Sequence, residues 1–246
     1  MKNLIIILFI HLCFLSPLKA LEYNASLFGC VSDGVTNNTS SIQYAINFIA
    51  EKGGGKLNFY VGRYLTGGIQ LKSNVTIELH EGAVLLASPN FYDYLKNSSG
   101  YALINAEKAE NVSIIGKGVI QGQVEPYLTQ LNDLILKGYL PDNKEVYMPS
   151  LLSFTNCTQV KVDGIFFSNS PAVVQKYVGT NDLELSGQII NSKVAKDSKG
   201  IVLINSKSIK LKNLFIETSG KGIESDNSNQ FSSVEKCILP NGKPAL

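Results

Sequence analysis

The chain has no tryptophan and only one arginine, Arg63. Arginine is the side chain best suited to forked contacts with phosphates and base edges. Setting aside Lys2 and Lys19, which lie in the first 20 residues, the 22 basic residues become 20, against 20 acidic residues. A chain with so little arginine and no net charge is a poor candidate for binding nucleic acid. We therefore predict no nucleic-acid partner.

Long apolar runs are missing too, apart from Leu4–Leu15 near the N-terminus. Lys2 precedes this run and Ser16–Ala20 follows it. A charged start, a short apolar core and a small residue at the end are the pattern of a secretory signal peptide. The run is too short to span a bilayer comfortably, and a membrane anchor is the alternative. We expect residues 1–20 to be removed on export, so that the protein is secreted, extracellular or periplasmic, with no membrane association after cleavage.

Cysteine is scarce: after residue 20 the chain has Cys30, Cys157 and Cys237. In an exported protein this odd number permits at most one disulfide. None of the three has the C-x-x-C spacing of a zinc site. We predict neither a metal nor a cofactor, and we expect Cys157, which lies among strand residues, to be a small buried group.

One segment has clear helical periodicity. Ser40 and Gln43 have the spacing of a capping box, which predicts a helix that starts at Ser40. One apolar face recurs at helical intervals through Ile42, Ala45, Ile46 and Ile49. Gly53-Gly54-Gly55 should end the helix, because glycine tolerates the left-handed conformation found there.

From Lys56 onward the chain reads as short strands. An apolar–polar–apolar triplet, followed by a turn residue and another apolar stretch, recurs at Val75-Thr76-Ile77, Val112-Ser113-Ile114, Val160-Lys161-Val162, Leu183-Glu184-Leu185 and Ile209-Lys210-Leu211. The last three triplets start 23 and 26 residues apart, a period typical of solenoids whose copies stack on a shared core. Inward Val, Ile and Leu with Asn, Gly and Asp at the corners favour a parallel β-helix. We predict an all-β fold, with residues 21–246 as one domain and residues 21–55 as its N-terminal cap.

Residues 122–149 interrupt this rhythm. The segment is polar, contains Pro126, Pro141 and Pro149, and has a short helical pattern at Tyr127–Leu136. Insertions in solenoids project from one face, often the binding face. A plain surface excursion is the alternative.

The stretch Leu27–Ser88 resembles the start of glycoside hydrolase family 28, the polygalacturonases. The matching pieces, which occur in the order and spacing of the family, include Asp33-Gly34-Val35-Thr36, the Ile42–Ala50 helix, Gly53-Gly54-Gly55, Gly62–Gly67 and Ile69–Thr76. A second match, at Leu151–Cys157, Val160, Gly164 and Ser168–Pro171, is similar to the family's central coils. The resemblance covers most of residues 27–220. It implies a right-handed parallel β-helix, export and a pectic substrate.

The resemblance also implies inverting hydrolysis, in which one carboxylic acid protonates the leaving oxygen and other carboxylates activate a water. The family supplies these groups from an Asn-Thr-Asp turn and, one coil later, an Asp-Asp turn. Here Asp197-Ser198-Lys199 and Gly220-Lys221 occupy these positions, so that lysines stand where acids are expected. A charged ammonium cannot accept a proton from water. The family's Gly-His-Gly turn and Arg-x-Lys motif are missing, and the chain looks C-terminally short.

Two carboxylates remain as weak candidates for catalytic groups, Asp197 and Glu224, and the simpler interpretation is that both are solvated turn residues. Lys199, Lys221 and Asn169 are candidates for binding an acidic polysaccharide. Residues 193–221 carry 7 lysines against 2 acidic residues, an excess that would suit galacturonate. Protection of strand edges is an equally simple reason for lysines on a solenoid.

Three functional hypotheses stay open. The chain is a degenerate polygalacturonase-family protein that binds pectic polysaccharide without cleaving it, a working glycosidase with relocated carboxylates, or a truncated structural relic with no ligand. A short solenoid should also expose its last coil, which favours end-to-end self-association.

Overall fold

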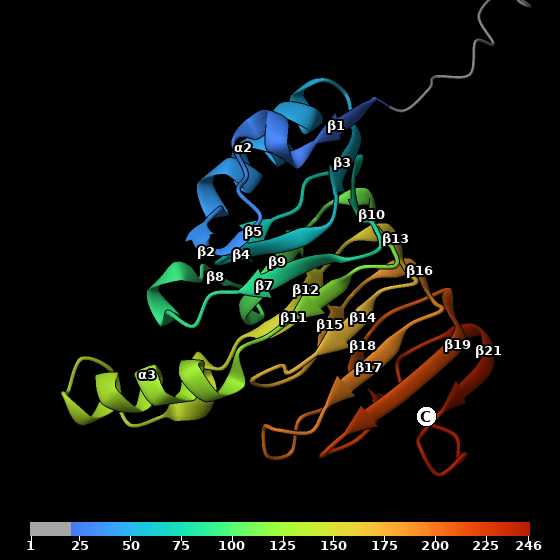
Figure 1. The fold of residues 1–246 in the computed structure, drawn as a ribbon. Helices are drawn as coiled ribbons and strands as arrows, with labels where there is room; N and C mark the ends of the chain where they lie inside the picture. The colour runs from blue at the N-terminus through green and yellow to red at the C-terminus, as the bar shows by residue number, and fades with distance from the viewer. Residues whose placement is uncertain (1–20) are drawn as a thin grey trace, which may run out of the picture.

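The computed structural model describes residues 21–246, and the expected signal peptide, residues 1–20, lies outside the described part. Strands from successive stretches of the chain lie side by side and run parallel, so the chain winds as a parallel β-helix (Figure 1). The predicted fold class is therefore confirmed.

The coils form a 14-stranded sheet with two arms, together with a 7-stranded sheet. The first arm contains β1 (Glu22–Asn24), β3 (Gly55–Phe59), β6 (Val75–Leu79), β10 (Glu110–Gly116), β13 (Thr158–Asp163), β16 (Asn181–Ser186), β19 (Ile209–Thr218) and β21 (Phe231–Ile238). The second arm contains β2 (Asp33–Asn37), β4 (Gly62–Thr66), β7 (Ala83–Ala87), β11 (Val119–Gln121), β14 (Phe166–Ser168) and β17 (Ile189–Ser192), and it joins the first arm at β19. The 7-stranded sheet contains β5 (Ile69–Gln70), β8 (Lys96–Asn97), β9 (Gly100–Glu107), β12 (Ser150–Thr155), β15 (Gln175–Val178), β18 (Ile201–Ile204) and β20 (Ile223–Ser225). The helices are η1 (Ala25–Phe28), α2 (Thr39–Glu51), η2 (Phe91–Asp93), α3 (Val124–Leu136) and η3 (Lys144–Tyr147).

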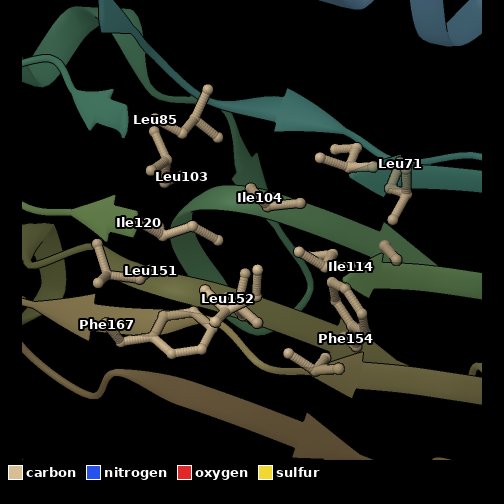
Figure 2. Close-up of a cluster of buried hydrophobic side chains, with 14 of the residues drawn as sticks. Leu71, Leu85, Leu103, Ile104, Ile114, Ile120, Leu151, Leu152, Phe154 and Phe167 are labelled. Carbon is tan, nitrogen blue, oxygen red and sulfur yellow. The ribbon is translucent and has the colours of Figure 1, made fainter. Parts of the chain in front are cut away.

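Inward-facing residues repeat from coil to coil. Ile114 of β10 pairs with Val162 of β13, which pairs with Leu185 of β16, and all three side chains are fully buried. In Figure 2, Leu85 and Phe154, which come from different sheets, both point into the interior. Burying one such side chain contributes about 1.5–3 kcal/mol, which stacked coils share and one coil alone could not obtain. The apolar positions predicted by the triplets thus form the core.

Residues in the left-handed conformation mark the same corner in successive coils. Asn111, Gln159, Asp182 and Ser208 have φ angles of 53°, 55°, 52° and 53°, and each immediately precedes the apolar triplet of its coil. Asn and Asp adopt this conformation at low cost, as the sequence predicted, whereas Gln159 and Ser208 were not anticipated there. The Asn111 Nδ2 donates to Asn74 Oδ1 of the preceding coil at 3.0 Å, so corner side chains also tie neighbouring coils together.

Helix α2 covers the N-terminal end of the β-helix, with the predicted apolar face buried (Figure 1). The predicted capping box is wrong, because the helix begins one residue earlier and its N-cap is Asn38. The Gln43 side chain instead accepts from the Gln70 amide at 2.7 Å and donates to the Gln70 carbonyl at 3.0 Å. Gln70 belongs to β5, the last strand of its sheet, so Gln43 satisfies backbone groups that a neighbouring strand would otherwise pair.

The insertion at residues 122–149 contains α3, which projects from the side of the β-helix (Figure 1). The helix begins three residues before the predicted Tyr127 and includes Pro126 in its first turn. Proline is tolerated there because the first amides of a helix have no intrahelical partner. The Tyr127 ring packs edge-on against Tyr94 at 5.8 Å, which anchors α3 to the coils. No helix within residues 21–246 is long and apolar enough to cross a bilayer.

The three cysteines of the described chain are buried and free, so the single disulfide that the sequence allowed does not form. Cys157 is fully buried, as expected for a small apolar group. Burial raises the pKa of Cys30 to about 11, which keeps its thiol protonated and unreactive at neutral pH.

Candidate functional site

The outer face of the 7-stranded sheet carries Glu224, one of the candidate residues from the sequence. Side chains alternate along a strand, so the buried Leu152 and Phe154 of β12 turn Ser153 outward. Ser153 pairs with Lys176 of β15. Residues that pair in the same register on the neighbouring strands extend these two positions into a row of outward side chains. We call this set the outer row; it consists of Gln70, Asn105, Ser153, Lys176, Val202 and Glu224.

A pocket of about 350 Å³ lies where the chain enters this sheet. The turn at Pro171–Val173, before β15, and the residues Lys196, Asp197 and Lys199, before β18, line it. Glu145 and Met148 of the insertion complete the lining. The volume falls in the range of small-ligand sites, about 300–1,000 Å³. The insertion therefore helps to form a cavity beside the position where the resembled family keeps its first catalytic turn.

Lys199 and Glu224 form an ion pair next to this pocket. The Lys199 Nζ lies 3.0 Å from Oε1 and 2.9 Å from Oε2 of Glu224, and the Lys221 Nζ lies 3.8 Å from Oε2. Pairing of β18 with β20 places the carboxylate one coil beyond Lys199, with both side chains about one third exposed. Two ammonium groups thus surround one carboxylate, which leaves a local excess of one positive charge.

The electrostatics of this cluster favour an ionised carboxylate. The hydrogen bond from Lys199 is the largest cause and lowers the pKa of Glu224; burial opposes it, and the charges of Lys199 and Lys221 lower the pKa further. A general acid in glycoside hydrolysis needs the opposite, a raised pKa that keeps its proton near neutral pH. Glu224 is therefore poorly suited to protonate a leaving oxygen. Within residues 21–246 no three His, Cys, Asp or Glu side chains gather closely enough to hold a metal ion.

The Lys199–Glu224 pair should make stability depend on pH at acidic values. Because the folded pKa of Glu224 lies below its ordinary value of 4.5, the pair's contribution is present above that pH and is lost as the pH falls through the folded pKa. Solvent screening limits the loss to less than about 1 kcal/mol. Urea denaturation of the wild type and Glu224→Gln should show a difference at pH 7 that shrinks as the pH falls below 4.5. A difference that does not change with acidification would contradict the pairing.

The other two candidates are placed differently. Asp197 lines the same pocket as Lys199, is exposed, and has a left-handed backbone with φ of 56°. Asn169 lines a separate pocket of about 270 Å³ with Gln121–Pro126 and Val194. The structure thus brings Lys199, Lys221 and Glu224 together, sets Asp197 beside them, and leaves Asn169 in a different cavity.

The sequence interpretation missed Lys176, Glu145 and Met148. Lys176 occupies an outward position in β15, whose inward Gln175 breaks the apolar–polar–apolar pattern that marks other strands. Glu145 belongs to η3 and Met148 is the C-cap of this helix, and their position depends on how the insertion folds back. Lys176 precedes the buried Tyr177 in β15, and this polar–apolar alternation is the sequence signal that could have identified Lys176.

Comparison with known proteins places the chain in a family. The model of the family "Glycosyl hydrolases family 28" matches residues 55–237, which is about three quarters of the chain. The chain belongs to glycosyl hydrolase family 28. A crystal structure from Parabacteroides merdae, of a protein assigned to the glycosyl hydrolases, superposes with a TM-score of 0.86 at 36% identity and covers 92% of this chain and 99% of that one.

Two curated relatives of the chain are much longer than the regions that align with it. An exo-poly-alpha-D-galacturonosidase from Dickeya chrysanthemi is 34% identical over 116 residues, which are 40% of this chain and 19% of that protein. A probable polygalacturonase from Vitis vinifera is 43% identical over 84 residues, which are 29% of this chain and 17% of that protein. The aligned regions therefore span less than a fifth of these two relatives. The family 28 exopolygalacturonase of Yersinia enterocolitica, at 23% identity and a TM-score of 0.75 over 87% of this chain and 48% of that one, shares the fold.

Proposed function

We propose that this family 28 protein is exported and binds pectic, galacturonate-rich polysaccharide without hydrolysing it. The binding region comprises the pocket beside Lys199 and the outer row of the 7-stranded sheet, which together we call the groove. Membership of family 28 supports the pectic ligand, since the named relatives include an exo-poly-alpha-D-galacturonosidase and a polygalacturonase. The observation that carries the proposal is the ion pair of Lys199 with Glu224, at 2.9 Å.

Loss of hydrolysis follows from the groups that this cluster contains. An inverting glycosidase needs a carboxylic acid that protonates the leaving oxygen and a separate carboxylate that activates a water on the opposite face of the sugar ring. The cluster contains one carboxylate, Glu224, whose pKa is lowered by Lys199 and which therefore has no proton to give near neutral pH. Asp197 is a second carboxylate beside the pocket, but its side chain is exposed to solvent. The relocated-carboxylate hypothesis therefore has little support from the geometry.

Binding of an acidic sugar follows from the same residues. The ammonium groups of Lys199 and Lys221 can each donate charge-assisted hydrogen bonds to a galacturonate carboxylate. The Lys221 side chain is 71% exposed, so it can reach a ligand without reorganisation of the coil. Glu224 competes with the ligand for both lysines, so we expect the wild-type protein to bind with moderate affinity.

The substitution Glu224→Gln separates the binding and hydrolysis hypotheses, because they predict opposite outcomes. If the groove binds, the neutral amide frees both lysines, and affinity for polygalacturonate should rise about threefold. If Glu224 is a relocated catalytic group, the wild type should release reducing ends from polygalacturonate and the variant should not. Calorimetric binding and a reducing-end assay on the same preparations measure both.

The matched control is Glu184→Gln on β16. Glu184 also pairs with a lysine, Lys161 at 3.2 Å, but on the outer face of the other sheet. This variant should bind like the wild type. Turnover that Glu224→Gln abolishes would contradict our proposal, and failure of the wild type to bind either polygalacturonate or rhamnogalacturonan would favour a structural relic.

A further inference from the structure

Lys176, at the centre of the outer row, has no carboxylate within 4.0 Å among the residues from 21 to 246. The ion pairs within 4.0 Å in residues 21–246 involve other lysines. The Lys176 Nζ donates instead to the backbone carbonyl of Ser99, at 3.1 Å. A carbonyl satisfies one of three ammonium donors and leaves the charge uncompensated. The centre of the groove thus has an ammonium group whose preferred partner, an anion, is missing from the neighbouring protein groups.

Ser153 lies beside Lys176 on the adjacent strand and has an unpaired hydroxyl. Its exposure is 2%, and its Oγ has no hydrogen-bond partner. Leaving a buried hydroxyl unpaired costs about 1–3 kcal/mol, so such groups call for a physical explanation. The register pairs Ser153 with Lys176, and Ser153 faces outward because Leu152 and Phe154 fill the core. A buried donor and a lone cation therefore adjoin each other on the same face of the sheet.

A short hairpin covers this pair, and we call its residues 96–100 the strap. Lys96 pairs with Tyr101 and Asn97 with Gly100 in antiparallel register, which leaves a two-residue turn at Ser98 and Ser99. The strap contacts the sheet on both sides of Ser153. The Ser99 Oγ lies 2.7 Å from the Thr155 Oγ1, and the Asn97 Nδ2 donates to Asn105 Oδ1. Together with the Lys176–Ser99 bond, these polar contacts hold the strap over the outer row.

The strap is a weak cover. A two-residue strand pair has little stability by itself, and segments held by a few polar contacts open locally at low free-energy cost. When the strap lifts, Lys176 loses its carbonyl partner, and Thr155 and Asn105 lose their contacts with it as well. Four polar side chains would then face the groove together, which are Asn105, Ser153, Thr155 and Lys176.

We propose that Lys176 and Ser153 form a second anion subsite, which takes the carboxylate of a uronate unit when the strap lifts. This inference rests on the proposed function and assigns it a further binding position. Lys176 and Glu224 are two strands apart in the outer row, about 10 Å at the usual strand spacing. One oligomer can therefore engage Lys176 and the Lys199–Lys221 cluster together, which raises its affinity above that of either position alone.

Calorimetric titration of a galacturonate oligomer tests the subsite through Lys176→Met and Ser153→Ala. Loss of one charge-assisted contact should weaken binding about tenfold for Lys176→Met, and loss of the hydroxyl should weaken it about threefold for Ser153→Ala. Ser153→Ala should not destabilise the fold, because it removes a hydroxyl that has no partner. A neutral galactose oligomer should bind weakly and equally to all variants.

The control is Lys210→Met, which removes the same charge from an outward position on the other sheet. It should bind like the wild type. If Lys176 only fastens the strap, Lys176→Met should leave affinity unchanged or raise it, and that result would overturn the inference. Should the wild type fail to bind the oligomer at all, the proposed function fails as well. If Lys199→Met weakens binding of the oligomer and Lys176→Met does not, the second subsite is contradicted while the proposed function stands.

Locking the strap tests its movement directly. The hydroxyls of Ser99 and Thr155 are close enough that Ser99→Cys with Thr155→Cys should form a disulfide across this contact. The oxidised double variant should bind the oligomer about tenfold more weakly than the wild type, and a reductant should restore binding. The wild type under the same redox treatment is the control, because the three thiols within residues 21–246 are buried and free. Wild-type affinity in the oxidised variant would show that the strap need not lift.

Discussion

Replacing Gly116 by alanine is expected to lower the free energy of unfolding by about 3–5 kcal/mol, which is a large part of the stability of a typical domain. Gly116 ends β10 with φ of 121°, a conformation that residues with a Cβ rarely adopt. An added Cβ would lie 2.1 Å from the Leu79 carbonyl oxygen of the preceding coil. A Cβ on Gly164, one coil later, would likewise lie 2.3 Å from the Gly116 carbonyl oxygen. Close approach of backbone to backbone at this corner sets the spacing of three coils, so one methyl group must displace them.

Gly100→Ala is the matched control for this prediction. Gly100 has φ of 116°, almost the same angle, but no atom lies within 4 Å of its added Cβ. Its substitution should therefore cost only the backbone strain, about 1–2 kcal/mol. Urea denaturation of both variants measures the difference that the clash contributes. Equal losses would show that the coil spacing at Gly116 yields easily.

The repeat was readable from the sequence because its signal is local. An apolar–polar–apolar triplet needs no knowledge of the neighbouring coil, and Val160–Val162 and Leu183–Leu185 stack as the pattern predicts. The apolar face of α2 is likewise set by residues three and four apart. The cap of α2 was less predictable. The Gln43 side chain can bond either the first turn of its own helix or the edge of β5, and in the structure it bonds the backbone of Gln70 in β5.

The strand β15 shows what a local pattern misses. Its inward Gln175 is fully buried, and its Nε2 donates to the Gln188 Oε1 at 2.6 Å while its Oε1 accepts from the Tyr177 hydroxyl at 2.8 Å. Gln188 in turn donates to the Val162 carbonyl at 2.8 Å. A buried polar network is acceptable when every member is paired, but Gln188 lies between β16 and β17, away from β15, and Val162 belongs to the preceding coil. No pattern within one strand could therefore indicate that Gln175 points inward and Lys176 outward.

The candidate site was predictable in composition and not in geometry. The resemblance placed lysines at the two acid positions, and this followed from residue identities alone. That Lys199 pairs with Glu224, 25 residues later, depends on the length of one coil, which can be predicted from the sequence only to within several residues. The same uncertainty in coil length applies to Asn169, which lies in a different pocket from Lys199.

Removing both ammonium groups of the cluster is expected to weaken binding of polygalacturonate about thirtyfold at low ionic strength. The double variant Lys199→Met with Lys221→Met loses two cations and leaves the Glu224 carboxylate unpaired in the groove, so the local charge changes from positive to negative. Attraction of a uronate is thereby replaced by repulsion. Lys199→Met alone should account for about tenfold and Lys221→Met for about threefold, since the Lys221 side chain is the more exposed.

Two further variants show whether this loss belongs to the site. Adding Glu224→Gln to the double variant should recover about threefold, because it removes the repelling carboxylate. The control is the double variant Lys207→Met with Lys210→Met, which also removes two positive charges. Neither lysine has an ion pair within residues 21–246. This variant should change the affinity less than twofold. The effect at Lys199 and Lys221 should shrink as salt rises and the screening length shortens. A defined binding site must respond to the position of each lysine. Equal losses of affinity in the two double variants would therefore show that binding of polygalacturonate depends only on the total charge of the solenoid, which would contradict the proposed site.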